Sequence, residues 1–225
     1  MTKLIVNKTD SAVQKIYKSD PVLAQLIEKV GDIEINLRED YFASLVRSIV
    51  GQQISVKAAS TIYVRLKTLL DHKLTAEKIN NVSLENLRSA GLTNRKAEYV
   101  KDLAKKVLAN ELDLKNIEKY NDEEIIEQLI TVKGIGKWTA EVFLLLTLGR
   151  KDVLAIDDVG IQRAAIWLYQ IDKSERRQIL IDKSPLWKPH RSIVSFYLWE
   201  AIHLGYLDNY ETIEDVYQAR KDVSN

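Results

Sequence analysis

The sequence contains no cysteine, only three prolines and only eight glycines among its 225 residues. The absence of cysteine excludes disulfide bonds, thiolate zinc sites, cysteine nucleophiles and iron–sulfur clusters held by cysteine. The small number of glycines and prolines disfavours sandwiches, collagen-like repeats and low-complexity tails. The three histidines, His72, His190 and His203, show no spacing that would hold a catalytic zinc ion.

Long hydrophobic runs are also missing. The longest apolar stretch, around residues 142–148, is too short to span a bilayer. The N-terminal apolar run at residues 4–6 has polar flanks and does not resemble a signal peptide. We therefore expect a soluble intracellular monomer with no membrane partner. Its compartment would be the cytoplasm, in association with the nucleoid, or the nucleus in a eukaryote.

The charges nearly cancel, with 33 Lys and Arg against 32 Asp and Glu, for a net charge of +1. Such a balance gives no whole-molecule attraction to nucleic acid. It does not exclude DNA binding either, because local clusters set the field at short range under screening. The binding partner must therefore be inferred from sequence motifs and not from the net charge.

The periodicity of the apolar residues predicts an all-α protein. Asp20 and Pro21 have the pattern of an N-cap followed by proline at the first helical position. Asn121 and Glu124 have the spacing of a capping box. Further helices are expected over residues 41–50, 55–70, 83–90, 93–108 and 137–148, and from residues 157, 173, 189 and 210. Residues 33–37 and 153–156 are the only candidates for short extended segments.

The most informative segment is LITVKGIGKWTA, residues 129–140, in which Gly134 and Gly136 lie two apart at the start of a helix. Glycines there allow close approach of the backbone and leave N–H groups pointing outward. The positive end of the helix, flanked by Lys133 and Lys137, favours an anion such as a DNA phosphate. A helix end followed by a helix start that binds nothing is the alternative for the glycines alone. The whole pattern, including Thr139 at the start of a buried helix, favours phosphate binding.

Three segments together resemble a known family, over about residues 40–205. The run LITVKGIGKWTAEVFLLLTLGRKDVLAIDD is similar to the hairpin, loop and aspartate of the helix-hairpin-helix DNA glycosylases, and most similar to their DNA-3-methyladenine glycosylase II branch. In the same branch, the segment whose side chain fills the gap in the duplex is similar to SLVRSIVGQQISVKAAS. The helix that bears a pocket tryptophan is similar to LWKPHRSIVSFYLWEA. The resemblance implies two helical lobes, residues 1–39 with 150–225 and residues 40–149. The hairpin, at about 125–148, and an active-site cleft would lie at their junction.

The resemblance implies base excision repair. A damaged base is rotated out of duplex DNA and its N-glycosidic bond is hydrolysed. Asp158 would be the catalytic carboxylate, because cleavage builds positive charge on the deoxyribose. Asp157 would cap the helix that follows. Family members that also nick the backbone carry a lysine where this sequence has Trp138, so we expect an enzyme without lyase activity that leaves an intact abasic site.

Alkylated purines such as 3-methyladenine and 7-methylguanine are cationic and stack well on aromatic faces. The resemblance places Trp138 and Trp199 at the pocket, and proximity in the pattern adds Tyr41 and Tyr197. Trp199 could instead be a core residue paired with Phe196.

Gln53 matches the side chain that fills the gap left by the flipped base, with Gln52 beneath it bonding backbone. Gln53, Lys133, Gly134, Gly136, Lys137 and Thr139 are thus the expected DNA-binding residues. No cofactor is expected to be required. The resemblance does imply a structural Na⁺ or K⁺ on the main-chain carbonyls of Ile130, Val132 and Gly134. Arg95 and Lys96 are either phosphate contacts or an ordinary solvated face.

Two alternatives remain. One is a glycosylase of the same fold that removes deaminated or oxidised bases, because the sequence does not reveal the shape of the pocket. The other is a non-catalytic helix-hairpin-helix DNA-binding protein. Asp158 at the end of its loop, together with aromatic residues on separate segments, argues against the second alternative.

Overall fold

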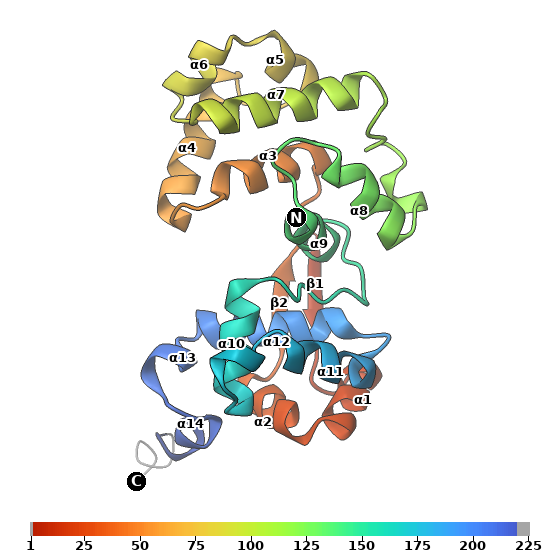
Figure 1. Cartoon of the computed structure of the whole chain (residues 1–225), viewed down its shortest axis with the longest axis vertical. Coiled ribbons are helices and arrows are strands. Elements are labelled where there is room, and N and C mark those ends of the chain that lie inside the picture. The colour runs from red at the N-terminus through yellow and green to blue at the C-terminus, as the bar shows by residue number, and fades with distance from the viewer. Residues whose placement is uncertain (1, 220–225) are drawn as a thin grey trace. The chain divides into compact units, whose positions relative to one another are not determined.

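The computed structural model describes residues 2–219, which fold into two compact units (Figure 1). Unit 1 combines the two ends of the chain, up to Leu37 and from Gly149 onward. Unit 2 is the continuous stretch Arg38–Leu148. No helix in residues 2–219 is long and apolar enough to cross a membrane.

Unit 1 is helical apart from one antiparallel pair of short strands. Its elements are β1 (Lys3–Val6), α1 (Ser11–Ser19), α2 (Pro21–Val30), β2 (Ile33–Asn36), α10 (Val159–Tyr169), the 3₁₀ turn η2 (Lys173–Glu175), α11 (Gln178–Trp187), α12 (Arg191–His203), α13 (Tyr206–Asn209) and α14 (Ile213–Ala219). The strands pair with Lys3 opposite Asn36 and Val6 opposite Ile33. Helix α12 packs against α10, α2 and α11, and its buried face includes Val194 and Leu198.

Asp20 ties three helices of unit 1 together. Its carboxylate caps α2 by accepting from the Leu23 N–H at 3.1 Å. It also accepts from the Tyr169 hydroxyl at 2.8 Å and from the Trp187 indole N–H at 3.1 Å. Lys183 lies 3.5 Å away, so this fully buried charge is both hydrogen-bonded and paired. The expected cap at Asp20 is confirmed, and it also fixes α10 and α11 relative to α2.

Unit 2 is entirely helical. Its elements are α3 (Tyr41–Gly51), α4 (Val56–Leu69), α5 (Ala76–Asn81), α6 (Leu84–Ser89), α7 (Asn94–Leu108), the 3₁₀ turn η1 (Ile117–Lys119), α8 (Asp122–Ile130) and α9 (Lys137–Leu146). Helix α7 packs against α3, α5 and α6, while α9 packs against α3 and α8. The core between them is built from fully buried side chains such as Leu45, Ile49, Val100, Leu103 and Leu144.

The all-α prediction is confirmed, with one small sheet as an addition. The capping box at Asn121 and Glu124 is present in both directions, at 2.9 Å each. Residues 153–156 were a candidate strand, and here the prediction was wrong, because they form an irregular loop. Helices α1 and α5 were not predicted. Both are short and draw their stability from tertiary packing, α1 against α2 and α5 against α7.

Candidate nucleic-acid interface and active site

The turn between α8 and α9 uses its two glycines for different reasons. Gly134 has φ +82°, and a Cβ there would lie 2.1 Å from the ring of Tyr99 on α7, so only glycine fits. Gly136 is the N-cap of α9 with φ −97°, and a Cβ there would meet nothing within 4 Å. Gly134 is therefore required by packing inside unit 2. Gly136 leaves open space in front of the helix start.

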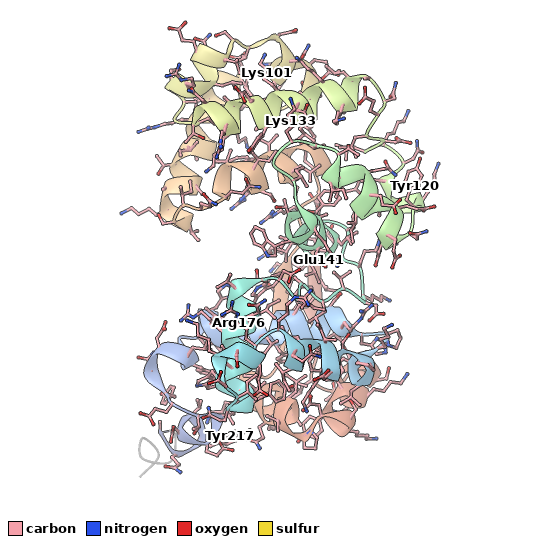
Figure 2. The ribbon with its side chains drawn as sticks, viewed as in Figure 1. Lys101, Tyr120, Lys133, Glu141, Arg176 and Tyr217 are labelled. Carbon is pink, nitrogen blue, oxygen red and sulfur yellow. The ribbon has the colours of Figure 1, made fainter. Side chains whose placement is uncertain are left out.

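Several N–H groups of this turn remain available to an anion. The Lys133 N–H donates to Asp102 Oδ2 at 2.9 Å, next to α7 (Figure 2), and the Ile135 N–H donates to the Val132 carbonyl at 3.0 Å. Within residues 2–219, the N–H groups of Gly134, Gly136 and Lys137 donate to no protein acceptor. The positive end of α9 and three open donors are the features with which a helix start binds an anion such as phosphate.

The side chains around the turn agree only in part with the expected DNA contacts. Lys133 and Lys137 are exposed, and the Lys137 ammonium lies 3.8 Å from Glu141 one turn further on. Thr139 is only 3% exposed, so its side chain is directed into unit 2, and the predicted DNA contact of this residue falls to its main-chain N–H. The apolar face of α9 packs into the core at this position, and only the main-chain N–H of Thr139 belongs to the open first turn.

The loop after α3 is tied directly to the hairpin. The Gln52 side-chain amide donates to the Gly134 carbonyl at 2.8 Å, which confirms that Gln52 bonds backbone. Gln53 follows with φ +57°, a left-handed conformation that is uncommon outside glycine, and its side chain is exposed. The residue expected to fill the gap in the duplex thus lies on an exposed turn anchored from below by its neighbour.

Lys96 supports the same loop from α7. Its ammonium donates to the carbonyls of Val50 and Gln52 at 2.7 and 2.8 Å, and burial lowers its pKa below the usual lysine value. Two of its three N–H donors are used on backbone carbonyls, so Lys96 caps the end of α3. This arrangement favours a supporting role for Lys96 over a phosphate contact. Arg95, its neighbour, is exposed.

In unit 1, Asp158 and not Asp157 caps the helix that follows. Asp158 Oδ1 accepts from the Ile161 N–H at 2.8 Å as the N-cap of α10, whereas Asp157 pairs with Arg177 at 2.8 Å. The prediction that Asp157 is the cap was therefore wrong. Either residue fits the capping rule from sequence, and the choice depends on where the loop enters the helix. Asp158 is 8% exposed and held in a fixed orientation.

A second donor reaches the Asp158 carboxylate from α12. The indole N–H of Trp199 donates to Asp158 Oδ1 at 3.3 Å. Phe196, one turn earlier, is buried, and its ring centroid lies 6.3 Å from that of Trp199. Phe196 is the core member of the pair, while the half-buried Trp199 also holds the carboxylate. The sequence contained no signal for this contact, because it depends on the packing of α12 against α10.

The loop that leads to Asp158 is fixed by the start of α12, although it lacks proline. The Arg191 guanidinium donates to both oxygens of Asp152, at 2.7 and 3.0 Å. The Ser192 hydroxyl donates to the Arg150 carbonyl at 2.6 Å and accepts from the Val153 N–H at 3.0 Å. These bonds replace the conformational restriction that a proline would supply.

The remaining expected pocket residues are placed as follows. Trp138, on α9, is 41% exposed and lines a cavity of unit 2. Tyr41 is half-buried and packs edge-on against Phe143. Its hydroxyl donates a hydrogen bond to Glu118, and this bond raises the pKa of Tyr41 to about 12. Tyr197 is fully buried, and its hydroxyl donates to the Gly31 carbonyl at 2.9 Å. The prediction that Tyr197 lines the base pocket disagrees with this placement in the core of unit 1.

Comparisons with known proteins place this geometry in a family. Residues 46–189 match the family described as HhH-GPD superfamily base excision DNA repair protein. The chain belongs to the HhH-GPD superfamily. It is 30% identical to DNA-3-methyladenine glycosylase 1 of Schizosaccharomyces pombe, over 80% of this chain and 82% of that protein.

Two solved structures are similar to this chain over most of its length. The crystal structure of a DNA-3-methyladenine glycosidase from Bacillus halodurans is 37% identical, with a TM-score of 0.86, covering 96% of this chain and 99% of that one. The Schizosaccharomyces pombe 3-methyladenine DNA glycosylase in complex with abasic DNA is 28% identical, with a TM-score of 0.75 and coverage of 85% and 96%.

Proposed function

We propose that this protein is a DNA-3-methyladenine glycosylase that flips alkylated purines out of duplex DNA and hydrolyses their N-glycosidic bonds. The observation that carries the proposal is the Asp158 carboxylate, held by the Ile161 and Trp199 N–H groups in a chain of the HhH-GPD superfamily. The similarity to DNA-3-methyladenine glycosylase 1 of Schizosaccharomyces pombe and to DNA-3-methyladenine glycosylase of Saccharomyces cerevisiae supports the choice of substrate.

The mechanism follows from the charge that develops as the base leaves. Departure of the base makes the deoxyribose cationic, and a carboxylate held in a fixed orientation stabilises that cation without reorganising. The same carboxylate orients a water molecule or takes its proton. Two N–H donors to Oδ1 hold Asp158 in one rotamer, so its charge is preorganised.

We further propose that the enzyme has no lyase activity. A Schiff base to the sugar needs a lysine in the pocket, and position 138 holds a tryptophan. The neighbouring Lys137 lies about 100° further round the helix, and its ammonium is directed toward Glu141. The product would be an intact abasic site.

DNA would be held at two places on unit 2. The open N–H groups at the start of α9 would bind a phosphate, and Gln53 would fill the gap left by the flipped base. We propose that the protein acts as a monomer in the compartment that contains the DNA. Trp138, Trp199 and Tyr41 remain the proposed aromatic contacts to the base.

A monovalent cation, Na⁺ or K⁺, is proposed on the carbonyls of Ile130, Val132 and Gly134. The donor set fits, because a carbonyl has two lone pairs. Within residues 2–219, the Val132 carbonyl accepts only from the Ile135 N–H and the Gly134 carbonyl only from Gln52. Bound there, the ion would add positive charge near the phosphate. Replacing K⁺ and Na⁺ with tetramethylammonium at constant ionic strength should weaken DNA binding, and unchanged binding would refute the site.

The decisive experiment measures release of free bases from methylated duplex DNA. Wild type should release 3-methyladenine. Asp158→Asn should lose release while keeping DNA binding, because asparagine preserves the helix cap. Asp157→Asn is the matched control and should keep full release, because Asp157 only pairs with Arg177 at the surface.

Other outcomes would assign another function. If wild type released no methylated purine, the assay would move to duplexes with hypoxanthine, uracil or 8-oxoguanine. Silence on all of them, with DNA binding intact, would favour a non-catalytic DNA-binding protein. Trapping of a covalent adduct with borohydride would contradict the absence of lyase activity.

A further inference from the structure

A cavity of about 240 Å³ in unit 2 carries two arginines and no acidic side chain. Its lining comes from the segment before α3, the end of α3 with the loop that follows, and the helices α4 and α9. It includes Arg38, Arg47, Ser48, Ile54 and Trp138. It therefore lies between the loop that carries Gln53 and the tryptophan expected to contact the base. Its volume is below the range typical for whole drug-sized ligands, so it suits a single small group.

The surroundings of the two guanidinium groups are neutral in the described part of the chain. In residues 2–219, neither Arg38 nor Arg47 lies within 4.0 Å of a carboxylate oxygen. Arg38 donates to the Ser48 hydroxyl at 3.3 Å, and Arg47 lies over the ring of Tyr63, 5.6 Å from its centroid. These neutral neighbours orient the arginines without neutralising them.

The arginines also repel one another. Burial, followed by the charge of Arg47, lowers the pKa of Arg38 below the usual arginine value. Two like charges at one cavity cost free energy unless an anion joins them. Arginine forks match phosphate oxygens in charge and geometry, and each such hydrogen bond is charge-assisted.

We propose that Arg38 and Arg47 form a second phosphate subsite, which binds the phosphodiester beside the flipped nucleotide. The inference rests on the proposed function and adds a contact separate from the hairpin. The base itself is a poorer occupant, because alkylated purines are cationic and two arginines would repel them. Trp138 lines the same cavity, so the proposed base contact lies beside this subsite.

The experiment uses full-length protein and a duplex containing a tetrahydrofuran abasic analogue. Each phosphate around the lesion is replaced in turn by a neutral methylphosphonate. Arg47→Met should weaken binding to the unmodified duplex about 10-fold. It should also reduce the magnitude of the slope of log K against log salt by about 0.9. Arg47→Lys, which keeps the charge, should recover much of the loss. The matched control is Arg65→Met, an exposed arginine of α4 that does not line this cavity.

The deciding result is coupling to one phosphate. On the duplex whose contacted phosphate is neutral, Arg47→Met should cause no further loss, and wild type should already bind that duplex about 10-fold more weakly. Equal effects of Arg47→Met and Arg65→Met would overturn the subsite. The subsite would also be overturned if Arg47→Met weakened binding equally at every methylphosphonate position. A loss of affinity seen only on a duplex that still contains the damaged base would overturn it as well. Base release by wild type, measured in parallel, tests the proposed function separately.

Discussion

The indole N–H of Trp199 donates to Oδ1 of Asp158 at 3.3 Å, so a tryptophan of α12 holds the carboxylate that begins α10. The same oxygen accepts from the Ile161 N–H, and the two donors together restrict the carboxylate to one orientation. Trp199 was expected to contribute only an aromatic face. In the structure it also contributes a hydrogen bond to the proposed catalytic group, which makes it a positioning residue as well.

Trp199→Phe should separate these two contributions. Phenylalanine keeps an aromatic face and removes the N–H, so single-turnover excision should slow by about 3- to 10-fold, as expected for loss of one hydrogen bond of about 1 kcal/mol. Binding to abasic-analogue duplex should be unchanged, because the carboxylate is retained. Trp199→Ala, which also removes the ring, should weaken substrate binding in addition. Equal rates for wild type and Trp199→Phe would contradict a positioning role.

The two hairpin glycines give a matched pair of substitutions. Gly134→Ala forces a Cβ to within 2.1 Å of Tyr99 at φ +82°, so it should lower the free energy of unfolding by about 2–4 kcal/mol. Gly136→Ala meets open space at φ −97° and should leave stability within about 1 kcal/mol of wild type. Its methyl group would nevertheless stand in front of the open N–H groups, so DNA binding should weaken.

Urea unfolding and duplex binding, measured on both glycine variants, check this pair. A stable Gly136→Ala protein that binds DNA like wild type would exclude the start of α9 as the phosphate site.

Local signals predicted much of the fold. The caps at Asp20 and Asn121 and the glycine spacing of the hairpin are short-range patterns, and each is present as expected. Long-range contacts were not predictable in the same way. That Gly134 must be glycine because of Tyr99, or that a serine and an arginine of α12 replace a loop proline, depends on segments distant in sequence.

The same limit applies to the site. The predicted backbone contact of Gln52 is confirmed. This contact could be predicted because Gln52 is the sequence neighbour of Gln53. The order of Asp157 and Asp158 was wrong for the cap, because both residues satisfy the rule and only the path of the loop decides. Tyr197 was misplaced because the face of α12 that carries it packs against the core of unit 1.

Lys96→Met should impair the Gln53 loop without removing a phosphate contact. It leaves the Val50 and Gln52 carbonyls without their lysine donor, so excision from duplex should slow by about 5- to 30-fold. Excision from single-stranded substrate should change little, because no gap needs filling there.

The salt dependence of duplex binding separates a supporting role of Lys96 from a phosphate contact. The slope of log K against log salt for Lys96→Met should match that of wild type. A slope whose magnitude is smaller by about 0.9 would mean that Lys96 binds a phosphate. Lys105→Met, an exposed lysine on the same helix, is the control.

Asp152→Asn tests how the loop before Asp158 is held, through its pH dependence. Burial alone would raise the pKa of Asp152, but the hydrogen bonds and charge of Arg191 outweigh it and hold that pKa below the usual value. The carboxylate therefore contributes stability that is fully present above about pH 4 and is lost as the pH falls through the lowered pKa.

At pH 7 the free energy of unfolding of Asp152→Asn, measured in urea, should be about 1.5–3 kcal/mol below that of wild type. This difference from wild type should shrink below about pH 4. The exposed pair Asp157 and Arg177 provides the control, since Asp157→Asn should cost no more than about 1 kcal/mol. A gap that stays constant from pH 7 to pH 3 would mean that the carboxylate charge does not hold the loop.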